Sequence, residues 1–238
     1  MLKLHEPIVT EMIEAIVSGR HAPGASLPNE IDLAQARGVS RTAAREAMQK
    51  LQSLGLIEVR RRKGASVLPR SNWNLLDPTV LDAAITYATD VDFFQSLIEV
   101  RLLIEPRAAE LAAQRANDRD LERIGAALAS MEAEAEGTRG PGWRIADLAF
   151  HTSIIDATGN WVLRQLIVTI GAALAAEIRV TGQYAASPKE SLQLHRNVFE
   201  AIRRHQPTEA HAAMTWLLIS TQRELDALNR DGKFRPRQ

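Results

Sequence analysis

Hydrophobic residues recur every three or four positions from about residue 79 to residue 230, and this period predicts α-helices with one apolar face each. Breaks rich in glycine and proline divide the stretch into separate helices. We expect these helices to start near residues 79, 91, 118, 142, 160, 187 and 207. Asp92, Asp118 and Ser187 are the N-caps that the sequence suggests. The fold class is therefore mainly α, with an all-α helical bundle in the C-terminal part.

The first seventy residues follow a different pattern, in which short helices precede two short strands. Helices are predicted over residues 6–18, 29–37 and 40–54, and strands over residues 57–59 and 65–68. The expected N-caps are Ser40 and Asn29, the latter with Asp32 three residues later to complete a capping box. A helix, a tight turn, a second helix and a basic hairpin form the outline of a winged helix-turn-helix.

The second helix of this pair carries polar side chains suited to reading DNA. Arg41, Arg45 and Gln49 recur at every fourth position and share one outward face. Arginine can bind guanine through two hydrogen bonds in the major groove, and glutamine can bind adenine in the same way. Ser40 and Thr42, beside the helix N-terminus, can bind phosphate oxygens. This face predicts contact with double-stranded DNA.

The hairpin adds positive charge to the same region. Four cations in a row, Arg60 to Lys63, precede Gly64, so Arg62, Lys63 and Gly64 are candidates for contact with the DNA backbone. Residues 1–70 contain eleven Lys and Arg against seven Asp and Glu, whereas the whole chain has no net charge. This asymmetry favours a polyanion as the partner of the N-terminal region. The alternative is a small helical domain with a solvated basic loop.

Ordered motifs in the N-terminal region resemble the GntR family of bacterial transcription regulators. They read His21-Ala-Pro-Gly24, Leu27-Pro28, Leu33-Ala34, Gly38-Val-Ser-Arg-Thr42, Arg45-Glu-Ala47 and Gly55-Leu-Ile-Glu58. The resemblance implies that Arg41 and Arg45 contact bases and phosphates of operator DNA, with Gly64 at the tip of the wing. It also implies a homodimer, as does the two-fold symmetry of helix-turn-helix binding sites. Ile31 stands where the family usually has an arginine that contacts DNA.

Three polar residues of the C-terminal part lie on apolar helix faces. Asp147 and His151 are one helical turn apart and share a face with Phe150 and Ile154. His195 lies on another such face. A carboxylate and two imidazoles that converge inside a bundle suit a divalent metal ion such as zinc, nickel or manganese. The alternative is one buried histidine bound to a carboxylate, with an unrelated histidine in the core.

The C-terminal part resembles the FCD domain of the FadR subfamily, a ligand-binding helical bundle. The residues that carry the resemblance are Glu99-Val-Arg101, Glu105-Pro106, Leu111-Ala-Ala113, Asp147-Leu-Ala-Phe-His151, Gly159-Asn160 and His195 to Ile202. The resemblance implies a metal site at Asp147, His151 and His195. Many such domains have a further histidine three residues after a methionine of the last helix. Leu217 follows Met214 here, which leaves three protein ligands and open coordination positions.

These resemblances give an expected domain organisation. Residues 1–70 form a winged helix-turn-helix DNA-binding domain, 71–78 a linker, 79–230 the ligand-binding helical domain, and 231–238 a tail. The linker joins the two domains through a polar stretch that contains proline.

Arg101 is a candidate for binding an acidic effector. Apolar residues surround it at helical spacing, so its side chain points inward and needs a carboxylate partner. That partner is either Glu105, one turn away, or an acidic ligand. Arg223, on the last helix, is a weaker candidate for the same role.

The segment from Pro69 to Leu81 resembles the linker of family members that repress galactonate operons. Those proteins share its Trp73-Asn-x-Leu-Asp77 core and also lack the last-helix histidine. The resemblance implies an aldonate such as galactonate, or a related sugar acid, as the effector. By the same match Arg70 approaches either the effector pocket or the DNA; the alternative is a solvated linker cation.

Composition excludes several other classes of protein. There are no cysteines, which excludes disulfides and cysteine zinc sites. No secretory signal is visible and no apolar run approaches the about 20 residues that span a bilayer, so we expect a cytoplasmic protein without a membrane partner. We expect no catalytic residues and no enzyme activity. One alternative is a regulator of the same class whose effector is another hydroxy acid or an acyl-CoA. The other alternative is a metal-dependent enzyme.

Overall fold

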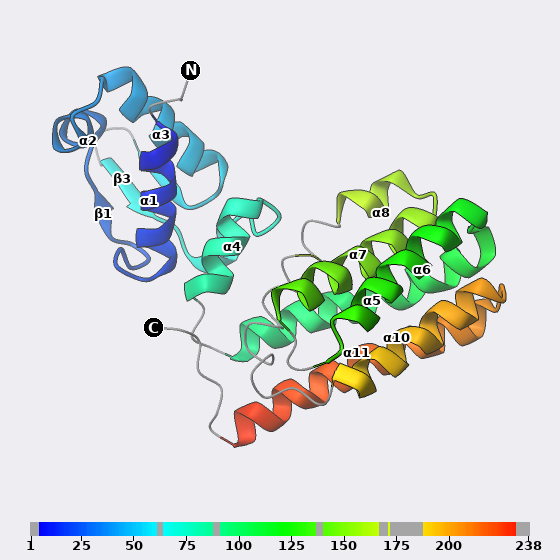
Figure 1. The fold of residues 1–238 in the computed structure, drawn as a ribbon. Helices are drawn as coiled ribbons and strands as arrows, with labels where there is room; N and C mark the ends of the chain where they lie inside the picture. Colours follow the sequence, from blue (N-terminus) through cyan, green and yellow to red (C-terminus); the bar gives the residue numbers. More distant parts are fainter. Residues whose placement is uncertain are drawn as a thin grey trace. The chain divides into compact units, whose positions relative to one another are not determined.

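The computed structural model describes residues 5–60, 64–87, 91–136, 140–166, 171 and 188–231. The chain divides into two compact units, with the division between Ala88 and Thr89 (Figure 1). The first unit contains short helices and a small sheet, and the described secondary structure of the second is all helical. The mainly α fold class is confirmed.

Three helices and their caps organise the first unit. They are α1 (Glu6–Val17), α2 (Glu30–Arg37) and α3 (Arg41–Ser53). The side chain of Asn29 accepts hydrogen bonds from the amides of Ile31 and Asp32, and that of Ser40 accepts one from Ala43, so both predicted caps are confirmed. Asp32 accepts a hydrogen bond from the Asn29 side chain at 2.7 Å, in place of the backbone bond of a capping box.

A three-stranded antiparallel sheet follows the helices. It contains β1 (Ser26–Leu27), β2 (Ile57–Arg60) and β3 (Gly64–Val67), in the order β1-β3-β2. The pairs Val59 with Ala65 and Arg60 with Gly64 fix the register of the predicted hairpin, which is confirmed. The sequence did not predict β1, because two residues are too few to show a strand period.

The segment after the sheet packs onto the first unit. After the short 3₁₀ helix η1 (Arg70–Asn72), the Trp73 indole donates to the Leu68 carbonyl at 3.1 Å. The Asn74 amide donates to the carbonyl of Leu54, at the end of α3, at 2.9 Å. Helix α4 (Pro78–Tyr87) then packs against α1. The structural division therefore falls about ten residues later than the expected start of the helical domain at residue 79.

The described elements of the second unit are all helices. They are α5 (Val91–Arg115), α6 (Asp118–Ala133), α7 (Pro141–Ala157), α8 (Trp161–Gln165), α10 (Pro188–Arg203) and α11 (Pro207–Arg230). Two predicted caps are wrong. Asn117, not Asp118, caps α6 because it completes a capping box with Asp120, and Asp92 lies inside the first turn of α5. The predicted cap Ser187 lies outside the described residues.

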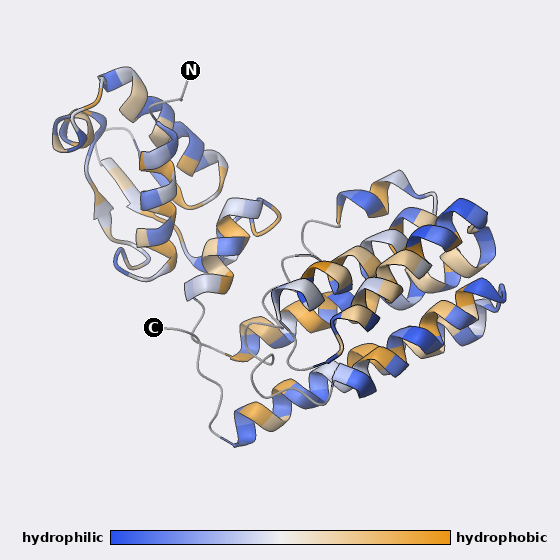
Figure 2. Ribbon diagram, in the orientation of Figure 1, coloured by the Kyte–Doolittle hydropathy of each residue, from blue (hydrophilic) through white to orange (hydrophobic). Residues whose placement is uncertain are grey.

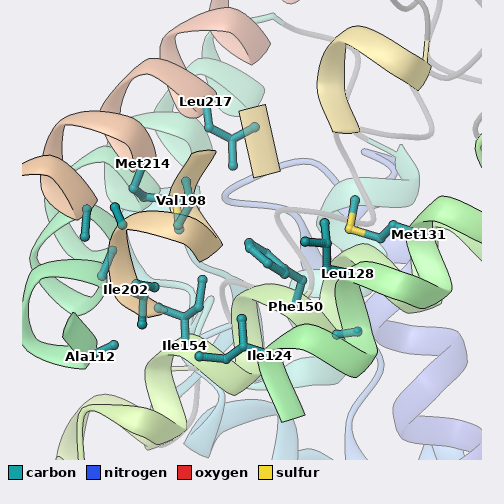
Figure 3. Close-up of a cluster of buried hydrophobic side chains, with 14 of the residues drawn as sticks. Ala112, Ile124, Leu128, Met131, Phe150, Ile154, Val198, Ile202, Met214 and Leu217 are labelled. Atoms are coloured by element: carbon teal, nitrogen blue, oxygen red, sulfur yellow. The ribbon is translucent and has the colours of Figure 1, made fainter. Parts of the chain in front are cut away.

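A large apolar cluster forms most of the described core of the second unit, and a smaller one surrounds Ala108 and Ile155. Helices α6, α7, α10 and α11 turn apolar sides inward and hydrophilic sides outward (Figure 2). Phe150 of α7 contributes to the cluster together with Leu128 of α6, Val198 of α10 and Met214 of α11 (Figure 3). Among the described residues, no helix is long and apolar enough to cross a membrane.

Candidate functional site

The outward face of α3 is the first candidate site. Arg41, Thr42, Arg45 and Gln49 are all exposed, as the four-residue spacing predicts. The opposite face is anchored, since Ala44, Ala47 and Leu51 are 0% exposed. Burial of that apolar face fixes which side of α3 turns to solvent. The helix can therefore present its arginines and glutamine to the edges of DNA bases.

The wing is the second part of this surface. Gly64 is exposed and has a φ of +79°, a left-handed conformation that favours glycine and turns the chain tightly into β3. Arg60 pairs with Glu58 on the same strand, with Nε and Oε2 3.0 Å apart. Arg62 and Lys63 lie outside the described residues. Gly64, at the end of the basic run, pairs with Arg60 and closes the β2–β3 hairpin.

A buried polar cluster in the second unit is the other candidate site. Asp147 and His151 come from α7 and His195 from α10, and their ligand atoms lie within 4.8 Å of one another. The Asp147 Oδ1 atom is 2.9 Å from His195 Nε2 and 3.8 Å from His151 Nε2. All three side chains are buried. The structure thus brings together the three residues that the sequence proposed as metal ligands.

The hydrogen bonds of the two rings test whether this cluster suits a metal ion. His195 Nδ1 faces the Ser191 carbonyl at 2.7 Å, and a carbonyl only accepts, so Nδ1 carries the proton. His195 Nε2 is buried with no geometrically acceptable hydrogen bond in the described structure. In its neutral form this nitrogen presents a lone pair to the Asp147 carboxylate. Two ring nitrogens and a carboxylate oxygen that converge in this way suit a divalent cation.

Arg101 and Glu105 of α5 adjoin the three ligands. Arg101 is 2% exposed, and its Nε donates to Glu105 Oε1 at 2.6 Å. The other carboxylate oxygen, Oε2, lies 2.5 Å from His151 Nδ1. Arg101 Nη2 lies 3.5 Å from His151 Nε2. Of the two partners that the sequence left open for Arg101, the structure shows Glu105.

The two buried carboxylates are held in the charged state. Burial by itself raises the pKa of Glu105, but the Arg101 guanidinium and the His151 ring outweigh burial and lower the pKa to about 2. Burial likewise raises the pKa of Asp147, yet the adjacent His195 and His151 rings and the Arg101 guanidinium hold the pKa below its ordinary value. Both side chains are therefore available as anionic acceptors near neutral pH.

Aromatic rings surround the His195 side of the cluster. The Phe150 and Trp143 rings lie edge-on to His195, with centroids 5.1 and 6.4 Å from its own. Leu217 of α11 is 4% exposed and belongs to the same apolar cluster as these rings (Figure 3). An apolar leucine therefore occupies the α11 position at which the sequence noted a missing histidine.

Two other proposed effector residues do not join the buried cluster. Arg223 is exposed, and its guanidinium lies 5.6 Å from the centroid of the Trp216 ring. Arg70 lies in the first unit, where its guanidinium is 5.9 Å from the Trp73 ring. Arginine stacking on an aromatic face is a common surface arrangement.

The contact between Glu105 and His151 is the feature of the site that sequence reasoning missed. The sequence predicts Glu105 as a possible partner of Arg101, because the two are one helical turn apart. His151, however, lies 46 residues further along the chain and on another helix. Only the packing of α5 against α7 brings the two side chains together.

Known protein families match both units of the chain. The bacterial regulatory protein gntR family matches residues 4–67, and the FCD domain matches residues 96–219. The galactonate operon transcriptional repressor of Escherichia coli (strain K12) is 36% identical over 91% of this chain and 94% of its own. The Uxu operon transcriptional regulator of the same organism is 30% identical, over 87% of this chain and 74% of its own.

A solved structure agrees with these sequence matches. The structure described as Streptococcus agalactiae GntR has 27% identity and a TM-score of 0.52, and the match covers 92% of this chain and 99% of that one.

Proposed function

The chain belongs to the GntR family of bacterial regulatory proteins and carries an FCD domain, and on this premise we propose that it represses a sugar-acid operon until the acid binds. As a member of this family it is a DNA-binding transcription regulator and not an enzyme.

On the DNA side, α3 enters the major groove and the wing follows the phosphate backbone. Exposed residues of α3 and its N-cap supply these contacts: Arg41, Arg45 and Gln49 in the groove, and Ser40 and Thr42 at the phosphates. Arg62, Lys63 and Gly64 supply those of the wing. In a homodimer, the two winged helix-turn-helix units bind the two halves of a palindromic operator. Since Ile31 is exposed but apolar, the contact that an arginine makes there in other members is absent.

On the effector side, one observation carries the proposal. A buried guanidinium, Arg101, lies beside the three metal-ligand candidates, with its Nη2 atom 3.5 Å from His151 Nε2. A carboxylate that pairs with Arg101 would therefore lie next to the metal position. Sugar acids carry a hydroxyl on the carbon beside the carboxylate, and the two groups together can chelate a cation.

The metal ion is divalent and is held by Asp147, His151 and His195, with zinc, nickel or manganese as the candidates. When bound, it supplies positive charge and open coordination positions for the acid's oxygen atoms. Leu217 offers no ligand atom, so positions remain for the effector.

The relatives support a sugar acid as the effector class. The galactonate operon transcriptional repressor matches nearly the full length of both chains, and the Uxu operon transcriptional regulator matches most of both chains. The segment from Pro69 to Asp77 also resembles the linker of galactonate-operon repressors.

The test is a thermal-shift panel followed by operator release. Purified protein is heated with each metal ion, with galactonate and other aldonates, and with simple hydroxy acids and acyl-CoA. A ligand that binds only the native state raises the melting temperature. We expect an aldonate and a metal to raise it together and to release operator DNA. A hydroxy acid or an acyl-CoA that alone gives both effects would replace the sugar acid in the proposal.

A further inference from the structure

Glu105 uses each oxygen of its carboxylate for a different partner. Oε1 accepts from Arg101 Nε at 2.6 Å and Oε2 lies 2.5 Å from His151 Nδ1. The side chain is almost fully buried, at 1% exposure. It therefore joins the candidate effector-binding residue of α5 to a candidate metal ligand of α7.

This contact decides which nitrogen of His151 faces the metal position. An ionised carboxylate can only accept hydrogen bonds, so Nδ1 of His151 carries a proton and donates it to Glu105. Nε2 then faces Asp147, at 3.8 Å. A carboxylate behind a ligating imidazole fixes its tautomer and ring orientation and strengthens it as a ligand.

The second histidine is held by a different kind of partner. His195 Nδ1 donates to the carbonyl of Ser191, one turn earlier on its own helix, at 2.7 Å. The orientation of His195 is thus fixed locally by α10. His151, in contrast, is held by Glu105, and within the described cluster Glu105 also binds Arg101.

We propose that Glu105 is a positioning residue that orients His151 toward the metal and couples metal binding to acid binding through Arg101. This inference rests on the proposed function, because it requires a metal at the three ligands and an acid on Arg101. An acid that draws the guanidinium toward itself changes the Arg101 contact with Glu105. The same carboxylate transmits that change to His151, so that metal and acid alter each other's affinity by the same factor.

The first test is the Glu105→Gln variant of the full-length protein. A glutamine has one accepting oxygen and one donating nitrogen, so it cannot accept from both partners. We expect the dissociation constant for Zn²⁺ to rise about 10- to 100-fold. We also expect the factor by which galactonate tightens Zn²⁺ binding to fall toward one, as measured by competition titrations with and without the acid.

A readout without metal separates positioning from general stability. In protein labelled with ¹⁵N at histidine, the ring-nitrogen shifts of metal-free His151 report which nitrogen carries the proton. We expect an Nδ1–H ring in the parent and a changed pattern in Glu105→Gln, with the His195 signals unchanged. Glu105→Asp retains the charge but shortens the side chain, and should give an intermediate loss. If Glu105→Gln does not fold, the same measurements are made on Glu105→Asp.

The matched control is Glu110→Gln, which removes an arginine partner from the same helix. Glu110 pairs with Arg107 outside the buried cluster, so Zn²⁺ affinity and coupling should stay at the parent values. Unchanged Zn²⁺ affinity, coupling and His151 shifts in the Glu105 variants would overturn the inference. So would a parent protein that binds no divalent metal, whereas acid-dependent operator release in the parent would still support the effector part of the proposed function.

Discussion

The two units of this protein place their candidate functional residues in opposite environments. On α3 of the first unit, Arg41, Arg45 and Gln49 are exposed above an alanine- and leucine-rich core. In the second unit, Arg101 and Glu105 are buried with the three metal-ligand candidates. An exposed arginine keeps its hydration until DNA replaces it, whereas a buried arginine depends on protein partners. Binding and stability are therefore separable in the first unit and linked in the second.

The largest expected effect is on the buried arginine. Arg101→Ala leaves the Glu105 carboxylate buried without its strongest positive partner, so the free energy of unfolding of the second unit should fall by about 3–5 kcal/mol. The response to acid should be lost as well, with operator binding retained where the variant is folded. Urea denaturation followed by circular dichroism measures the first effect, and operator titrations with galactonate measure the second.

Arg107→Ala is the control for that substitution, since Arg107 pairs with Glu110 at the surface of the same helix. It should change stability by less than about 0.5 kcal/mol. Equal losses in the two variants would break the contrast between buried and exposed arginines.

The next largest effect is expected on the stability of the first unit, at Gly55, which lies outside the exposed polar face of α3. Gly55 has a φ of +70°, and a Cβ there would lie 2.1 Å from the Asn72 carbonyl oxygen. Gly55→Ala should therefore destabilise the first unit by about 2–4 kcal/mol, through left-handed strain and the close contact together. Thermal unfolding followed by calorimetry measures this.

Gly38 offers a matched control for the close contact. Its φ is +63°, yet a Cβ there meets nothing within 4 Å. Gly38→Ala should show the strain alone, about 1–2 kcal/mol. If Gly55→Ala is no worse than Gly38→Ala, the segment around Asn72 is not packed against the end of α3 as the structure has it.

A smaller effect, on binding alone, is expected at the exposed face of α3. Arg45→Ala should weaken operator binding by about 1–3 kcal/mol if Arg45 reads a base, while the melting temperature stays at the parent value. Fluorescence anisotropy with a selected operator and with a scrambled duplex distinguishes loss of specificity from loss of charge. Parent-like affinity for the operator would show that α3 does not read the DNA.

The smallest effect is expected at Lys63 of the wing, on the strength of the sequence alone. Lys63→Ala should weaken binding to all sequences similarly and reduce the slope of log affinity against log salt by about one. Binding measured over a series of salt concentrations gives this slope. A change confined to the operator, with the slope preserved, would assign Lys63 to a base instead of a phosphate.

Most elements and the exposed polar face of α3 were predictable because they depend on local pattern. The caps Asn29 and Ser40 act on amides two or three residues away, and the four-residue spacing of Arg41, Arg45 and Gln49 fixes their common side. Errors arose between neighbouring cap residues, as at Asn117 and Asp118, because the choice depends on which side chain completes a reciprocal pair. The strand β1 was missed because its partner β3 lies almost forty residues away.

The metal-ligand candidates were predictable in part. The Asp147 and His151 spacing places both on one face of α7, but nothing in the spacing says that His195 of α10 lies 2.9 Å from Asp147. Family resemblance supplied that link, and the structure supplies the distance.

By itself, the sequence determined two mainly helical regions, an exposed polar face on α3 and the residue types of the buried site, since each follows from neighbours within a few positions. Tertiary structure alone decided that α4 packs with the first unit, because helical periodicity shows an apolar face but not which core will bury it. It also decided that Glu105 joins Arg101 to His151. A carboxylate selects its partners by distance in space, and the packing of α5 on α7 sets that distance.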